Sequence, residues 1–376
     1  MSMQKRFTGI SLVIFISILI SFVQPAAAAS NLFEAATVKK ISSESTLEYP
    51  EGTFYVQELE VRLEDGSTIS VPHGSEFQPV THLQRLAAGN QVIVMHPESD
   101  QVVGPVIYEE YRLPILLWLF VGFVLLVLIV AGVKGLLSIL GMFISLGILM
   151  GFVVPQILAG ANALIITVVA AILIATVTVY LSHGWKIGSH IALGSILITL
   201  VAVSLLSYWF VSLARLTGLG SEEAAFLQIE QLGQVDLRGL LLSGIMLGAL
   251  GVLDDIAVTQ VATVFELKRA NKKLGFSELY ERGMRVGRDH VASLVNTLVL
   301  AYAGANLPLF LLFSSTAAVP AWVNISSGLV AEEVVRTLIG SMGLVAAVPV
   351  TTALAAYWAG KVANSNLLKT AGHTHS

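Results

Sequence analysis

The chain has no cysteine, and only 12% of its residues are charged, about half the share that a soluble domain carries. The absence of cysteine excludes disulfides, thiolate metal sites, iron–sulfur clusters and cysteine nucleophiles. The shortage of charge, in a chain whose residues are 55% hydrophobic, indicates that membrane lipid is the main solvent and a partner. A net charge of −4 provides no basic surface, so nucleic acid is not an expected partner.

Several catalytic motifs are also missing. The sequence has no Gly-x-x-x-x-Gly-Lys loop for nucleotide phosphates, no His-Glu-x-x-His metalloprotease motif and no Gly-x-Gly-Asp motif of intramembrane aspartyl proteases. No nucleophile and base stand at a recognisable spacing, and the two histidines of the C-terminal tail are too few for a metal site. We therefore expect no catalytic residues, no metal ligands and no cofactor, and we do not expect an enzyme.

The first 29 residues have the pattern of a secretory signal peptide. Lys5 and Arg6 form a positive start, residues 7–23 are apolar, and residues 24–29 offer a small-residue cleavage site. The alternative is an uncleaved anchor, because 7–23 approaches the roughly 20 residues that span a bilayer. In either case the following segment is expected outside the cytoplasm.

Residues 30–112 alternate apolar and polar side chains in short runs. The pattern predicts strands at 54–63, 68–71, 91–95 and 101–103, separated by turn-forming residues. Several short strands in so few residues favour a small extracytoplasmic β-barrel-like domain of the OB or SH3 kind. Acidic residues outnumber basic ones here, which is typical of an ordinary solvated surface.

Residues 113–363 are predicted to form an α-helical polytopic membrane domain, followed by a cytoplasmic tail at 364–376. Each predicted span has about 20 mostly apolar residues, the length that crosses a bilayer. The seven spans lie at 113–133, 135–154, 162–182, 187–211, 238–263, 291–313 and 337–359.

The distribution of positive charge predicts the orientation of these spans. If the β domain is outside, all basic residues after position 112 fall on the inner side except Arg215, Arg238 and Arg336. This agrees with the positive-inside rule. We expect a multi-pass protein of the cell membrane with its N-terminal domain outside and its C-terminus in the cytoplasm.

Two adjacent carboxylates, Asp254 and Asp255, lie inside the fifth predicted span. Ionisable groups within a span cost about 2.5–3.5 kcal/mol on insertion scales and are functional candidates for that reason. Asp255 and Thr259 share a helix face at i and i+4, and Gln260 follows. Oxygen ligands of this kind suit a proton or a hard cation. The alternative is a structural pairing of one aspartate with a basic residue of the adjacent inner loop.

The sixth and seventh spans contain further polar or helix-breaking residues. Asp289 is interpreted as a helix N-cap before the sixth span, and Asn296 lies deeper within it. Asn306 and Pro308 are expected to interrupt the outer half of that span, and Pro349 to interrupt the seventh. Interrupted spans expose backbone carbonyls to ions in many transporters, although kinks without a site are also frequent.

A cluster of charges begins the seventh span. Glu332 and Arg336 stand at i and i+4, and we expect them to pair at the membrane interface in a structural role.

These motifs, in their order along the chain, resemble the YibE/F-like family of multi-pass membrane proteins. The resemblance covers about 105–360 and strengthens the expected architecture. In the family's glycine-rich motif one acid is dependable, and it aligns with Asp255. The family brings no established activity, so it implies no substrate. The matching residues are Tyr111-Arg-Leu-Pro114, Lys134-Gly135, Gly248-Ala-Leu-Gly251 with Asp255, Gly287-Arg-Asp289, Asn296-Thr-Leu with Tyr302 and Gly304, and Pro349.

Two functional hypotheses remain open. The first is a secondary transporter or permease of an ion or small solute, in which Asp255 is the proton or cation site, Asp254 is a second candidate, and Thr259, Gln260, Asn296 and Asn306 add polar ligands. The second is a non-catalytic membrane scaffold that recruits a partner through the outer domain, with the acids serving helix packing. A homo-oligomer is compatible with either hypothesis.

Overall fold

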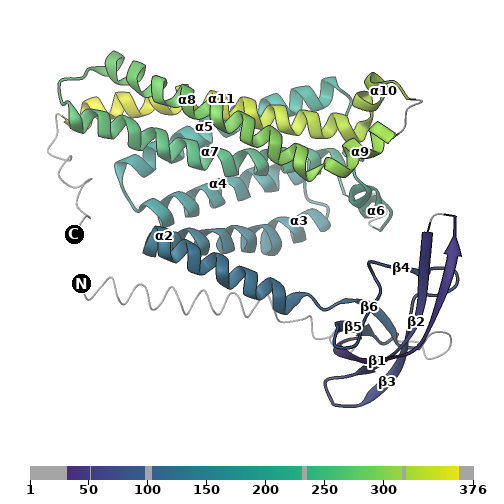
Figure 1. The fold of residues 1–376 in the computed structure, drawn as a ribbon. Coiled ribbons are helices and arrows are strands. Elements are labelled where there is room, and N and C mark those ends of the chain that lie inside the picture. The colour runs from purple at the N-terminus through teal and green to yellow at the C-terminus, as the bar shows by residue number, and fades with distance from the viewer. Residues whose placement is uncertain (1–31, 51, 98–103, 231–234, 316–318, 364–376) are drawn as a thin grey trace. The chain divides into compact units, whose positions relative to one another are not determined.

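The computed structural model describes residues 32–50, 52–97, 104–230, 235–315 and 319–363. The predicted signal segment 1–29, the tail 364–376 and the strand expected at 101–103 lie outside these residues. The chain divides into two compact units, Met1–Val133 and Lys134–Ser376. The first unit contains the strands, and the second contains most of the helices (Figure 1).

The first unit contains a six-stranded antiparallel sheet with the order β3-β2-β1-β5-β6, and β4 pairs with β2. Alternate side chains along these strands point into one core, which contains Val38, Leu59, Val61, Val92 and Val94. Among the described strands β3 and β6 lie in contact but are not paired, so the domain is an antiparallel sheet whose two edges approach each other without a closing ladder. The strands are β1 (Phe33–Tyr49), β2 (Gly52–Arg62), β3 (Thr68–His73), β4 (Val80–Thr81), β5 (Gln91–Met95) and β6 (Val106–Glu110).

Each predicted apolar run lies in a helical stretch of the described chain, but α8 and α11 begin well before the predicted spans and several helices extend beyond them. Asn162 and Asp236 cap two of them, because their side chains accept the backbone N–H of Ile165 and Gly239 at 3.1 and 3.0 Å. The elements are α2 (Leu113–Ile148), a π-helical turn η1 (Leu149–Val153), α3 (Val154–Leu158), α4 (Ala163–His183), α5 (Ile187–Leu213), α6 (Glu222–Glu230), α7 (Leu237–Ala270), α8 (Phe276–Ala305), α9 (Leu307–Ser315), α10 (Ala321–Ser326) and α11 (Gly328–Ala363).

Five helical stretches of the described chain are long and apolar enough to cross a membrane, or six if the bent pair α8–α9 counts as one span. The expected number of seven is therefore not observed. The first stretch, Leu113–Leu158, has 46 residues and joins the two spans that the sequence predicted separately. The helical backbone is broken inside it at Gly132, where φ is 58° and ψ is −143°.

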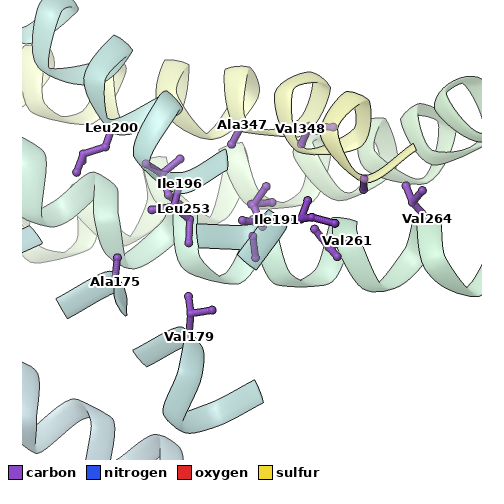
Figure 2. Close-up of a cluster of buried hydrophobic side chains, with 14 of the residues drawn as sticks. Ala175, Val179, Ile191, Ile196, Leu200, Leu253, Val261, Val264, Ala347 and Val348 are labelled. Atoms are coloured by element: carbon purple, nitrogen blue, oxygen red, sulfur yellow. The ribbon is translucent and has the colours of Figure 1, made fainter. Parts of the chain in front are cut away.

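Helix α7 is the centre of the second unit and packs against α4, α5, α8 and α11. Its buried face carries Leu253, Val261 and Val264. Figure 2 shows these side chains gathered with Ile196 of α5 and Val348 of α11 in one apolar cluster. Because α7 is enclosed by four helices, polar side chains on it are held at fixed positions within the unit.

Candidate functional site

The two acids of α7 face different surroundings. Asp254 is partly buried and its carboxyl lies beside Thr178 of α4. One of its oxygens, Oδ1, is fully buried and has no hydrogen-bond partner among the described residues. Asp255 is exposed on the surface of the unit. The different environments follow from helix geometry, since successive side chains point about 100° apart.

Neither acid has a basic partner in an ion pair within the described chain, so the pairing with an inner-loop cation is not observed. His183, the last residue of α4, is close enough to interact electrostatically with both acids. The same histidine also interacts with Lys134 and Lys186. His183 is therefore influenced by both the carboxylates and the basic residues. It was not predicted from the sequence, although a histidine at the end of a predicted span was a usable signal.

A cavity of about 330 Å³ opens beside this histidine. It is enclosed by the end of α4, the first turns of α5 and the last turns of α7. Its charged lining consists of Lys134, Lys186, Glu266 and Arg269. The structure thus places a histidine in a charged cavity at one end of the second unit, and this histidine is in electrostatic range of Asp254, whose Oδ1 is unbonded.

Gln260 differs from the two acids because its side chain is buried and hydrogen-bonded to neighbouring helices. It is 2% exposed, and its amide nitrogen donates to the backbone oxygen of Gly283 at 2.7 Å and to Thr352 Oγ1 at 2.8 Å. Both amide hydrogens are therefore used within the protein, and the residue joins α7, α8 and α11. Thr259, by contrast, is exposed on the same face as Asp255.

Small residues of α8 allow this junction to form. A Cβ atom at Gly283 would lie 2.8 Å from Thr352 Cγ2, and one at Gly287 would clash with Val348. The two glycines stand at i and i+4, the small-xxx-small spacing at which membrane helices approach closely. In α7 a Cβ atom at Gly248 would lie 3.3 Å from the Tyr302 hydroxyl, whereas Gly244 and Gly251 have no atom within 4 Å of that position.

Two predictions about helix ends are wrong. Asp289 does not cap a helix, because α8 already begins at Phe276 after the N-cap Gly275 and Asp289 lies well inside it. Pro349 does not interrupt the seventh span, because α11 continues through it. Proline removes one N–H and leaves the carbonyl four residues earlier without its donor, which kinks a helix but need not end it when neighbouring helices support both sides.

The interruption at Pro308 is confirmed. Helix α8 ends at Ala305 and α9 begins at Leu307, bent by 65°. Asn306 stands at the break, where its side-chain Nδ2 donates to the Tyr302 carbonyl at 3.0 Å. Pro308 occupies the first turn of α9, where its missing N–H costs no intrahelical bond. Asn296 is exposed on α8 and does not line the cavity beside His183.

A mostly apolar cavity of about 240 Å³ adjoins this break. Asn306, Tyr302 and Glu333 are its main polar members. Glu333 pairs with Arg336, so the expected pair between Glu332 and Arg336 is wrong.

Glu332 is instead a buried carboxylate, 6% exposed, that accepts the backbone N–H groups of Gly218 and Gly220 at 2.9 and 3.2 Å. It fastens the segment after α5 to the start of α11. The spacing rule for helical ion pairs suggested the wrong partner because the true partners are backbone groups more than a hundred residues away, which a sequence pattern does not reveal.

The fold and the apolar helices define a membrane protein with several spans. A family model described as YibE/F-like protein matches residues 119–361, and the chain belongs to this family. No curated protein and no solved structure matches the chain.

Proposed function

We propose that the protein is a secondary transporter or permease of an ion or small solute, in which Asp254 is the coupling carboxylate. The proposal rests mainly on the buried Asp254 oxygen that has no partner among the described residues. Buried polar atoms in proteins are almost always satisfied, so such an atom within a span calls for a proton, a cation or water. Asp255 and Thr259 lie on the adjacent exposed face and are not part of the proposed site.

His183 gives the proposed site a route to water. It interacts electrostatically with Asp254 and with Lys186, and it lines the 330 Å³ cavity. Histidine exchanges protons near neutral pH, and chains of acids and histidines carry protons in many pumps and transporters. In this proposal a proton from the cavity binds an imidazole nitrogen of His183, and the imidazolium passes a proton to the Asp254 carboxylate.

Ion flux into proteoliposomes tests this function. With a trapped pH-sensitive dye, and separately with sodium- and potassium-sensitive dyes, the wild type should exceed protein-free vesicles for at least one ion. Asp254→Asn and His183→Gln should fall to the vesicle leak, while Asp289→Asn, an exposed acid of α8 outside the site, should retain wild-type flux. Retention of flux by Asp254→Asn contradicts the assignment.

A scaffold is the second candidate, and one observation favours it. The β sheet has a core of its own within a separate unit, as a recruiting domain requires. The scaffold is the better account if the wild type conducts none of the tested ions and if deletion of 30–110 alone reproduces the cellular phenotype of deleting the whole protein.

We further propose seven spans, with the β domain outside and the C-terminus in the cytoplasm. A helix of 46 residues is about 69 Å long, twice the roughly 30 Å of a bilayer core, and the break at Gly132 would divide it into two crossings. One more crossing added to the six gives seven.

The natural absence of cysteine makes this topology easy to test. A single cysteine at Ser75 in the β domain should react with a membrane-impermeant maleimide in intact cells, whereas one at Lys273, in the turn between α7 and α8, should react only after lysis. Labelling of both positions in intact cells would contradict the orientation.

A further inference from the structure

The cavity beside His183 has an excess of positive charge. Three of its lining side chains, Lys134, Lys186 and Arg269, are cationic, and Glu266 is the carboxylate among them. Glu266 pairs with Arg269. Within the part of the chain that the structure describes, no carboxylate forms an ion pair with either lysine, and the two adjacent aspartates of α7 act on His183 without lining the cavity.

The backbone adds to this positive potential. The 27-residue helix α5 begins at Ile187 without a side-chain cap, and its first internal bond runs from His190 N–H to the Lys186 carbonyl. The amides of Ile187, Gly188 and Ser189 therefore have no acceptor inside the helix, and all three residues line the cavity. The helix dipole places its positive end at the same point.

Apolar side chains complete the walls. Ala192, Val258, Val261 and Phe265 line the cavity together with the charged residues. Low-dielectric walls focus the field of the cations and strengthen their attraction for an anion. The positive-inside rule explains why basic residues gather at this end of the unit, but it does not explain why two unpaired lysines line the same cavity as a helix N-terminus.

The neighbouring aromatic residues indicate the depth of the opening. Trp185 is 77% exposed and stacks on Tyr180 with ring centroids 4.2 Å apart. Exposed tryptophan and tyrosine are enriched at the level of lipid head groups. An anion could therefore reach the cavity from the aqueous side or as the head group of a lipid.

We propose that this cavity binds a phosphate-type anion, held by Lys134, Lys186 and the free amides of α5. The site does not require the transport function, because anion binding can occur and be measured without any flux. Tetrahedral oxyanions suit it, since ammonium groups and backbone N–H groups are both hydrogen-bond donors to oxygen.

The test uses the full-length protein purified in detergent. In one arm inorganic phosphate is titrated at constant ionic strength, with sodium chloride as the balancing salt, and binding is followed by the shift of the thermal unfolding midpoint. In the second arm the protein is placed in nanodiscs that contain either phosphatidylcholine alone or added phosphatidylglycerol. Binding in the first arm indicates a soluble anion, and binding in the second arm alone indicates a lipid head group.

Charge-neutral variants locate the site. Lys186→Gln and Lys134→Gln should each weaken binding by about tenfold, the effect of 1.4 kcal/mol. Lys273→Gln is the matched control, because this exposed lysine lies at the same end of the unit but does not line the cavity. It should bind within about twofold of the wild type, and Lys186→Arg should restore most of the affinity lost in Lys186→Gln.

Two results would overturn the proposal. One is the absence of any midpoint shift in both arms for the wild type. The other is an equal loss in Lys273→Gln and Lys186→Gln, which would show that the general positive potential, and not this cavity, attracts the anion. All variants replace exposed side chains, so their unfolding midpoints without ligand should match the wild type.

Discussion

Two polar side chains with buried atoms, one in each unit of the molecule, differ in their hydrogen bonding. In the β unit, Gln57 is 1% exposed and both ends of its amide are bonded. Its Nε2 donates to the Leu86 carbonyl at 3.0 Å and to Glu44 at 2.8 Å, and its oxygen accepts the Leu86 N–H at 2.9 Å. In the helical unit, the buried Oδ1 of Asp254 has no such partner in the described chain.

Whether a buried polar group is bonded within the chain indicates whether its role is structural or functional. A fully bonded buried polar group rigidifies a core, whereas an unbonded one is costly unless something outside the chain satisfies it. Gln260 and Glu332 show that the helical unit is also able to satisfy buried polar groups. Among the described side chains, Oδ1 of Asp254 is the one carboxylate oxygen that is buried and unbonded. The other buried atoms there without a hydrogen-bond partner belong to His96, Thr167, Arg238, Arg336, Ser341 and Thr351.

The largest effect is expected when a bonded group of the helical unit is removed. Glu332→Ala should lower the stability of the second unit by about 3 kcal/mol, because the amides of Gly218 and Gly220 lose their acceptor. The thermal midpoint in detergent measures this change. Glu332→Gln keeps one acceptor oxygen and should lose less. An unchanged midpoint in Glu332→Ala would show that water replaces the carboxylate.

A somewhat smaller loss is expected in the β unit. Gln57→Leu nearly conserves volume but strands the Leu86 N–H and C=O, and should destabilise the sheet by about 2 kcal/mol. Protease sensitivity of the β unit in the full-length protein reports this loss. Gln78→Leu, at an exposed position of the same unit, is the control. Equal resistance of all three proteins would mean that the bonds of Gln57 contribute nothing.

Close helix packing predicts a further decrease of about 1–2 kcal/mol. Gly287→Ala places a methyl group against Val348 and Gln260, where no space exists, and overpacked cores lose stability. Gly304→Ala is the matched control in the same helix, because no atom lies within 4 Å of its Cβ position. Thermal midpoints of the two variants should differ. A midpoint for Gly287→Ala at or above that of Gly304→Ala would contradict the packing.

The smallest expected effect is a loss of stability of the β unit at acidic pH. Arg85 donates two hydrogen bonds to Glu44, which lowers the pKa of that carboxyl below its ordinary value of 4.5. The pair stabilises the fold fully above about pH 4.5, and this contribution is lost as the pH falls through the lowered pKa. Arg85→Gln should remove this part of the acid sensitivity, measured as protease resistance between pH 6 and 3. If the wild type and Arg85→Gln have the same pH profile, the pair of Arg85 and Glu44 does not contribute to acid sensitivity.

Much of the architecture could be predicted from the sequence because it depends on local periodicity. Alternation located β2, β3 and β5, and the apolar runs located the helices. Strand β1 was missed because most of its second half is exposed and polar, and it is held by its pairing with β2. Helix α8 was expected to begin near position 291 because its first half is charged, yet it begins at Phe276.

The candidate site was predicted only in part. The acids of α7 were found because charge in an apolar run is conspicuous, but sequence alone does not reveal which acid faces the neighbouring helix. The contribution of His183 and the bond from Glu332 to Gly218 depend on contacts between distant segments. Such contacts follow from helix packing, which periodicity does not determine.

The most direct test of the central claim is the thermal stability of the purified protein across a panel of pH values and cations, for the wild type, Asp254→Asn and Asp255→Asn. A bound ion stabilises by about 2.7 kcal/mol at a hundredfold excess over its dissociation constant. We predict that the wild type responds to one ion or one pH step, that Asp255→Asn keeps this response, and that Asp254→Asn loses it. The same response in all three proteins would contradict a coupling site at Asp254.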